Sequence, residues 1–142
     1  MRQPPRILIV DDIPTNLDIL QTRLAVHGYD IRTATDGEEA LAKARADQPD
    51  LILLDVMMPK LDGLEVCRRL RADPSLPFMP IILVTARADS KDVVAGLEAS
   101  GDEYLTKPVD QAALVARVKS MLRIKALHDT TREQAARLEA QS

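Results

Sequence analysis

The sequence has few aromatic residues, a single cysteine and no excess of positive charge. Its 142 residues include two tyrosines, one phenylalanine and no tryptophan, so the stacking surfaces that bind single-stranded nucleic acids are missing. With Cys67 as the only cysteine no internal disulfide can form, which fits a reducing compartment. The formal net charge of −3 argues against non-specific binding to nucleic acid or to an anionic membrane.

Long apolar runs are also missing. No segment approaches the roughly 20 apolar residues that a membrane-spanning helix needs. The first six residues, MRQPPR, lead straight into a strand-like run, so we expect no signal peptide. We therefore expect a soluble, cytoplasmic protein with neither a membrane nor a nucleic acid as its direct partner. Apolar residues still make up 46% of the chain, enough for one globular domain with an aliphatic core.

Apolar, β-favouring segments alternate with segments of helical spacing along the chain. This alternation predicts an α/β fold with a parallel sheet, right-handed crossovers and helices on both faces. We expect the flavodoxin-like, doubly wound arrangement with strand order 2-1-3-4-5. The predicted strands cover residues 6–10, 29–34, 51–55, 81–85 and 103–106, and the predicted helices cover 14–27, 38–46, 64–72, 90–99 and a stretch from about 110.

The C-terminal stretch is longer than such a domain needs. From Asp110 to about residue 140 there is neither glycine nor proline, which predicts one extended helix. We place the domain at residues 1–124 and a helical extension at 125–142, leading to an output domain outside this chain. Apolar and polar residues follow a 4-3 spacing that indicates either a weak coiled-coil seam, through which the chain would form a homodimer, or a frayed, solvated tail. The positions of this spacing are Ile124, Leu127, Thr131, Gln134 and Leu138.

Polar side chains stand where four of the predicted strands end. Asp11 and Asp12 follow the first strand, Asp55 ends the third, Thr85 ends the fourth, and Lys107 follows the fifth. Any one of them alone would be an ordinary turn or solvated residue. Because parallel strands end at the same edge of a sheet, together they predict a cleft with three acids, a hydroxyl and an ammonium group.

This combination predicts metal-dependent phosphoryl chemistry. Three neighbouring carboxylates repel one another unless a cation joins them, and a site with only oxygen ligands suits Mg²⁺, with Mn²⁺ as a substitute. A carboxylate can attack phosphorus and form an acyl phosphate. Lys107 and the metal would neutralise the charge on the migrating group, and Thr85 would donate a hydrogen bond to it.

Over residues 5–124 the chain resembles the receiver domains of response regulators. The resemblance rests on the two acids after ILIV, on LILLDVMMPKLDG, on Thr85-Ala86 after IILV, and on YLTKP. It implies that Asp55 accepts a phosphoryl group from a histidine kinase or a phosphotransfer protein, and that the chain catalyses nothing beyond its own phosphorylation and dephosphorylation.

The resemblance also implies a set of residue roles. Asp12, Asp55 and the Met57 backbone carbonyl would bind Mg²⁺ directly and Asp11 through water. Thr85, the Ala86 backbone and Lys107 would contact the phosphoryl group. Thr85 and Tyr104 would form a conformational switch of the face made by the fourth and fifth strands, and the bond before Pro108 would be cis. DVMMPKLDGLEVCRRLRADP and VKSMLRIKALHD are most like receivers at the front of multidomain regulators with cyclase-type outputs.

Alternatives from other classes remain. A phosphohydrolase with an aspartate nucleophile also uses Asp and Mg²⁺, but typically shows Asp-x-Asp after the first strand, whereas the nucleophile candidate here follows the third. A flavin module would need a phosphate loop where Asp11 and Asp12 would repel phosphate. A stand-alone phosphotransfer protein fits the same residues, whereas the intact set of acids argues against a degenerate receiver that serves only as an interaction platform. Met57 cannot orient a hydrolytic water as an acid or amide could, which predicts modest self-dephosphorylation.

Overall fold

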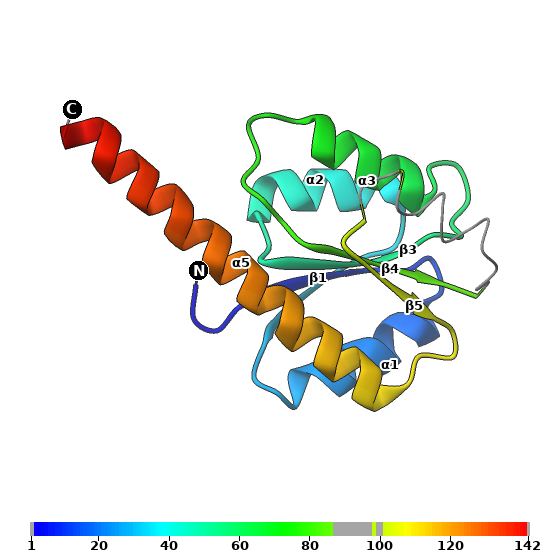
Figure 1. Ribbon diagram of the computed structural model, residues 1–142. Coiled ribbons are helices and arrows are strands. Elements are labelled where there is room, and N and C mark those ends of the chain that lie inside the picture. The colour runs from blue at the N-terminus through cyan, green and yellow to red at the C-terminus, as the bar shows by residue number, and fades with distance from the viewer. Residues whose placement is uncertain (1, 87–97, 99–100, 142) are drawn as a thin grey trace.

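Five parallel strands form a single sheet in the order β2-β1-β3-β4-β5 (Figure 1). The computed structural model describes residues 2–86, 98 and 101–141. This order, with helices on both faces, confirms the predicted flavodoxin-like α/β fold. The strands are β1 (Arg6–Val10), β2 (Asp30–Ala34), β3 (Leu51–Asp55), β4 (Ile81–Thr85) and β5 (Glu103–Thr106).

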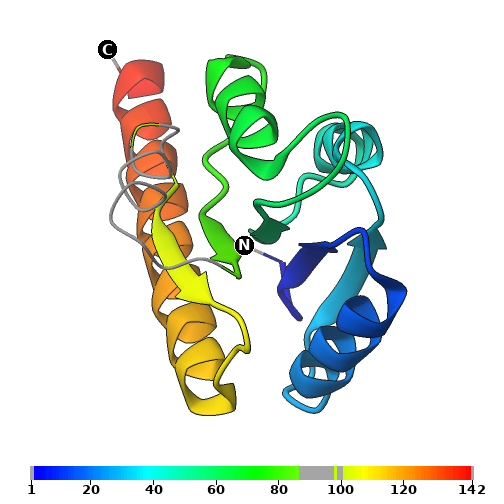
Figure 2. The same cartoon turned by 90° about the vertical axis from the view of Figure 1, so that its right-hand side faces the viewer.

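The described helices cover the sheet in two pairs. Helices α1 (Pro14–Ala25) and α5 (Gln111–Gln141) lie on one face, and α2 (Gly37–Asp47) and α3 (Gly63–Ala72) lie on the other (Figures 1 and 2). The helix predicted over residues 90–99 lies outside the described residues, apart from residue 98.

The sheet is buried on both faces, which explains its sequence. All five residues of β3 and all five of β4 are buried, and continuous apolar runs are what a central parallel strand requires. One core cluster joins the strands to α2 and α3, and a second joins them to α1 and α5. The sheet therefore provides a rigid base for the residues at its edge.

Local capping fixes where helices begin near that edge. Asp62 accepts a hydrogen bond from the Glu65 backbone N–H at 2.9 Å and caps α3, and Asp36 caps α2 in the same way from Glu39 at 2.7 Å. Pro14 occupies the first turn of α1, where its missing N–H carries no penalty.

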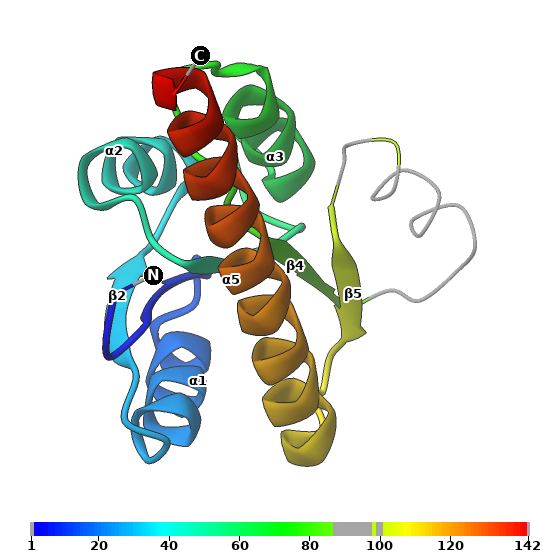
Figure 3. The same ribbon diagram turned by 60° about the vertical axis from the view of Figure 1, so that its left-hand side comes forward.

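Helix α5 extends beyond the domain, as predicted. It has 31 residues, or about 46 Å, and projects away from the sheet (Figures 1 and 3). Every described side chain from 130 to 139 is exposed. Within the described residues, no helix combines the length and apolarity that crossing a membrane would require. The buried residues of α5 form one stripe: Leu114, Val118, Met121, Leu122 and Lys125.

Candidate functional site

The predicted polar residues gather at the edge where the strands end, which Figure 2 shows from the front. Val10 pairs in register with Leu54, so the residues that follow, Asp11 and Asp55, come out of neighbouring strands side by side. On the other side of β3, Asp55 pairs with Val84, which brings Thr85 to the same edge. The strand order alone therefore brings together side chains from distant parts of the sequence.

Three carboxylates form the centre of the site. Asp11, Asp12 and Asp55 each contribute an oxygen, and these oxygens lie within 4.8 Å of one another. Asp11 and Asp55 are almost fully buried, with 1% and 3% of their surfaces exposed, while Asp12 is half-buried. Burying like charges together is unfavourable unless a cation compensates for them.

Backbone groups orient two of the carboxylates. The Ile13 N–H donates to Asp11 Oδ1 at 2.9 Å, and the Met57 N–H donates to Asp55 Oδ1 at 3.2 Å. Both are bonds from a backbone two residues further on, a local geometry that aspartate favours at the start of a turn. In each residue the Oδ2 atom remains directed to the shared centre, where Lys107 lies.

Lys107 follows β5, the outermost strand of the sheet, and its side chain extends to the acids. Its Nζ lies 2.9 Å from Asp11 Oδ2 and 3.5 Å from Asp55 Oδ2. Partial burial opposes its charge, but the hydrogen bond to Asp11 and the charge of Asp55 outweigh burial and raise the pKa of Lys107. Its backbone N–H donates to the Thr85 carbonyl at 2.7 Å, and its bond to Pro108 is cis.

Burial changes the pKa of Asp55. Desolvation, followed by the neighbouring charge of Asp11, raises the pKa of Asp55 from 3.8 to about 6. The Lys107 charge and the Met57 N–H act in the opposite direction and compensate only in part. Carboxyl groups with strongly perturbed pKa values cluster at functional sites, which makes Asp55 a candidate for the reactive group.

This donor set fits a hard divalent cation. The cluster offers only carboxylate oxygens, which Mg²⁺ and Mn²⁺ prefer, and it lacks the nitrogen or sulfur ligands typical of zinc. Two ligands of one Mg²⁺ ion lie at most about 4.2 Å apart, so oxygens within 4.8 Å of one another need only a small adjustment for two of them to bind the same ion.

The remaining predicted site residues surround this centre. Thr85 is buried, with 1% of its surface exposed, and Ala86 follows it at the surface. The Met57 side chain is 55% exposed at the edge of the site. Tyr104 on β5 pairs in register with Leu83 and packs, half-buried, against the core cluster of α2 and α3.

Gly63 is a site residue that sequence reasoning missed. A Cβ placed there would lie 2.2 Å from the Asp55 carbonyl oxygen and 2.9 Å from Val56 Cα. Only glycine lets the start of α3 approach the Asp55 backbone this closely. The signal in the sequence was the Asp62-Gly63 pair, immediately before the helix predicted from residue 64.

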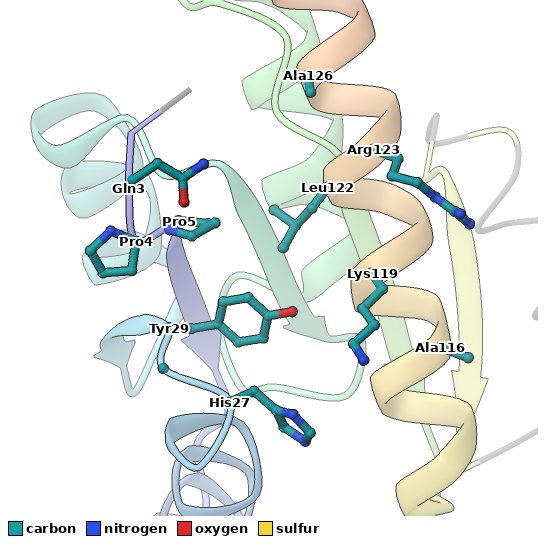
Figure 4. A pocket seen from close by; sticks show the side chains of 11 residues that line it. Gln3, Pro4, Pro5, His27, Tyr29, Ala116, Lys119, Leu122, Arg123 and Ala126 are labelled. Atoms are coloured by element: carbon teal, nitrogen blue, oxygen red, sulfur yellow. The ribbon is translucent and has the colours of Figure 1, made fainter.

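Two cavities lie outside the carboxylate cluster. One, of about 410 Å³, adjoins the site between α1 and the Lys107–Val109 segment. The other, of about 750 Å³, lies between the N-terminal segment, Tyr29 and α5 (Figure 4). Figure 4 shows Lys119 and Tyr29 directed toward one another across it. The residues that line this second cavity include no carboxylate.

Comparison with known proteins identifies the class. The sequence profile of the response regulator receiver domain matches residues 7–119, and the chain belongs to this family. The chain is 47% identical over 131 residues to the response regulator PleD of Caulobacter vibrioides, which covers 92% of this chain and 29% of PleD. The chain is therefore a phosphoacceptor receiver domain of two-component signalling.

Solved structures agree with this assignment. A crystal structure from Chloroflexus aurantiacus J-10-fl superposes with a TM-score of 0.81 at 40% identity, covering 84% of this chain and 98% of that one. The BeF₃-activated N-terminal receiver domain of Klebsiella pneumoniae RstA gives a TM-score of 0.76 at 31% identity, covering 83% and 98%. The chain spans less than a third of PleD and about half of the transcriptional regulator PhoP of Bacillus subtilis.

Proposed function

We propose that Asp55 accepts the phosphoryl group. The observation that carries this proposal is the position of its carboxylate, at the end of the central strand β3, beside two further acids and 3.5 Å from Lys107. An Asp55 oxygen would attack the phosphorus of a phosphohistidine. An O–P bond forms, the P–N bond breaks, and its electron pair returns to the imidazole, which takes up a proton. Lys107 then lies where it can balance the phosphoryl charge.

The carboxylate cluster would hold Mg²⁺ or Mn²⁺. We assign Asp12, Asp55 and the Met57 backbone carbonyl as direct ligands and Asp11 as a ligand through water. Asp11 suits the indirect role because Ile13 and Lys107 already engage both of its oxygens. When bound, the cation neutralises charge on the phosphoryl oxygens. Thr85 and the Ala86 backbone would donate hydrogen bonds to the same oxygens.

Beryllofluoride, which mimics an aspartyl phosphate, tests this assignment. With Mg²⁺ present, fluorine NMR should show one bound adduct per chain, and chelation should remove it. Asp55→Asn should abolish the adduct, whereas Asp18→Asn, an exposed acid on α1, should leave it intact. An adduct that survives in Asp55→Asn would refute the assignment. Turnover of phosphate esters beyond one equivalent would instead favour a hydrolase.

Thr85 and Tyr104 would report the phosphorylation. Thr85 ends β4 next to the site, and Tyr104 lies one strand away, paired with Leu83. A shift of the Thr85 hydroxyl toward the phosphoryl group would open space that the half-buried Tyr104 ring could enter, giving two states biased by one local charge. Adduct formation should shift the Tyr104 ring resonances in wild-type protein. In Thr85→Ala they should stay unchanged although the adduct forms; an equal shift would contradict this role.

The phosphodonor would dock on α1. Ile13 and Ile19 are 49% and 44% exposed, and Ile19 lines the cavity that adjoins Lys107. Exposed aliphatic residues beside a reactive carboxylate suit a histidine kinase or phosphotransfer protein. Ile19→Glu should slow phosphorylation by such a protein and leave phosphorylation by acetyl phosphate unchanged. Equal rates with the protein donor would contradict this surface.

An output would follow the receiver on a longer chain, since the receiver accounts for only part of PleD and PhoP. The exposed residues Ile124, Leu127 and Leu138 could pair two α5 helices. Sedimentation with and without the adduct tests whether this helix forms a homodimer. A monomer at all concentrations in both states would contradict pairing.

A further inference from the structure

Helix α5 remains attached to the domain beyond residue 124, where the sequence suggested that the extension begins. Lys125 is only 5% exposed, although lysine is rarely buried without partners. Its Nζ donates to the Phe78 carbonyl at 2.8 Å and lies 2.9 Å from Asp129 Oδ1. Lys125 and Asp129 lie beyond residues 7–119, the range that the family profile matches, whereas Phe78 lies within it.

Phe78 is the centre of this attachment. Its ring stacks on His128 with the ring centroids 4.0 Å apart, and the Arg71 guanidinium lies 5.4 Å from its centroid. One aromatic residue thus contacts α5 through its ring and its carbonyl, and the end of α3 through Arg71. Figures 2 and 3 show the C-terminal half of α5 passing beside α3.

The segment around Phe78, between α3 and β4, is also bonded to neighbouring elements. Arg71 donates to the Met79 carbonyl at 2.9 Å and forms an ion pair with Asp102. Asp102 in turn accepts the Ile81 N–H at 2.8 Å, at the first residue of β4. Phe78 therefore sits on a network that joins α3 to the beginnings of β4 and β5.

We infer that Lys125 and His128 lock α5 onto the segment around Phe78, with Asp129 holding the Lys125 ammonium group from the next turn of the same helix, and that this lock fixes the direction in which the chain leaves the receiver domain. Beyond Asp129 all described side chains are exposed, so these are the last contacts that can orient the projecting helix. Strand β4 begins at Ile81, three residues after Phe78, and runs to Thr85 over about 13 Å. The lock thus connects the exit helix to the strand that ends at the site; this connection, unlike the lock itself, rests on the proposed function.

Distance measurements between spin labels test the lock. Labels at Ala42→Cys on α2 and Ala136→Cys on α5 would report the direction of the helix. Cys67 is buried, and burial raises its pKa to about 11, so the labels react at the introduced sites. The wild-type lock predicts a narrow distance distribution.

The decisive variant is His128→Ala/Asp129→Ala, which removes the stacking and the ion pair from a part of α5 that is largely exposed. Its distribution should broaden roughly twofold as the helix end samples more directions. Arg132→Ala/Glu133→Ala, one turn beyond the lock, is the matched control and should stay narrow. Both variants introduce two alanines, so intrinsic helix propensity is matched between them. An equally narrow lock variant, or an equally broad control, would overturn the inference.

The beryllofluoride adduct separates this inference from the proposed function. In wild-type protein the adduct should shift the mean distance, and in the lock variant the shift should disappear. A complete adduct without a shift in wild-type protein would overturn the connection to β4. Failure to form any adduct would instead refute the role of Asp55. The lock would then be tested by the distance distributions measured without beryllofluoride.

Discussion

The Lys107 ammonium group is bound to the Asp11 carboxylate at 2.9 Å, across a separation of 96 positions in the sequence. This bond joins the first strand to the last at one edge of the sheet. The same ammonium group lies 3.5 Å from Asp55, so one positive charge is shared between two buried acids. The site therefore contains more negative charge than it neutralises, which is what a cation-binding centre requires.

Removing the Lys107 charge should separate metal binding from phosphoryl transfer. Lys107→Ala leaves the acids less compensated, so Mg²⁺ should bind on the order of tenfold more tightly. Phosphorylation should nevertheless slow, because no ammonium group remains to balance the phosphoryl oxygens. Lys107→Arg keeps the charge and should leave Mg²⁺ affinity nearly unchanged. Calorimetric titration measures both affinities, and weaker Mg²⁺ binding by Lys107→Ala would contradict this electrostatic account.

Because the pKa of Asp55 is raised in the folded state, the metal-free protein should be less stable to unfolding at neutral pH than at low pH. The folded state holds the Asp55 proton up to about pH 6, whereas the unfolded chain releases it near 3.8. The stabilisation is thus complete below about pH 4 and is lost as the pH rises through about 6. The difference between the two pKa values corresponds to at most about 3 kcal/mol.

Urea unfolding in the presence of a chelator measures this effect. Asp55→Asn should be more stable than wild-type protein at pH 7, and the difference should shrink toward pH 4. Added Mg²⁺ should reverse the order, because it binds the folded wild-type protein. A difference that does not depend on pH would contradict the titration of Asp55.

Mg²⁺ affinity should fall as the pH drops below about 6. Metal binding requires the ionised carboxylate, so the proton and the metal compete for Asp55. Each further pH unit should weaken binding about tenfold until other acids also titrate. Affinity that is constant from pH 7 to 5 would show that Asp55 is not a ligand.

Glycine at position 63 should matter for the site as well as for stability. Gly63→Ala places a methyl group against the Asp55 carbonyl and should destabilise the protein by about 1–3 kcal/mol. It should also weaken Mg²⁺ binding because the Asp55 backbone is displaced. Gly28→Ala is the matched control, since Gly28 has a φ of +83° but open space around its Cβ position. It should lower stability by about 1 kcal/mol without changing Mg²⁺ affinity. Equal effects of the two variants on affinity would contradict this role of Gly63.

The strands and the polar residues that end them could be predicted from the sequence, because each depends on a local pattern. The strand order was predicted from the known doubly wound arrangement. An apolar run that stops at Asp55 indicates both a buried strand and the position of its last side chain. The roles assigned to Thr85, Tyr104 and the metal ligands remain predictions, since they concern a phosphorylated and metal-bound state.

Long-range contacts of residues that look polar could not be predicted. Lys125 interrupts the apolar spacing of α5 and looks like a solvated residue, yet its stem is buried and its charge is bound by Phe78 and Asp129. Gly63 similarly looks like part of a turn until the fold places it against Asp55. Both depend on which segments meet in space, and periodicity carries no information about that.

Met57 should make the phosphorylated state long-lived. Its exposed thioether chain stands two residues after Asp55 and cannot orient a water molecule for attack. Met57→Asn adds an amide at this position and should shorten the acyl-phosphate lifetime on the order of tenfold. Loss of the phosphoryl group over time, followed by mass spectrometry, measures both rates. A wild-type half-life of seconds would contradict the prediction.

The most direct test of the account is phosphorylation of the chain by acetyl phosphate with Mg²⁺, followed by intact-mass measurement. We predict the gain of a single phosphoryl group by wild-type protein, which should not form when the metal is chelated before acetyl phosphate is added and should be absent from Asp55→Asn. Asp55→Asn that still gains the group, or wild-type protein that gains none, would contradict the assignment of Asp55 as the phosphoacceptor.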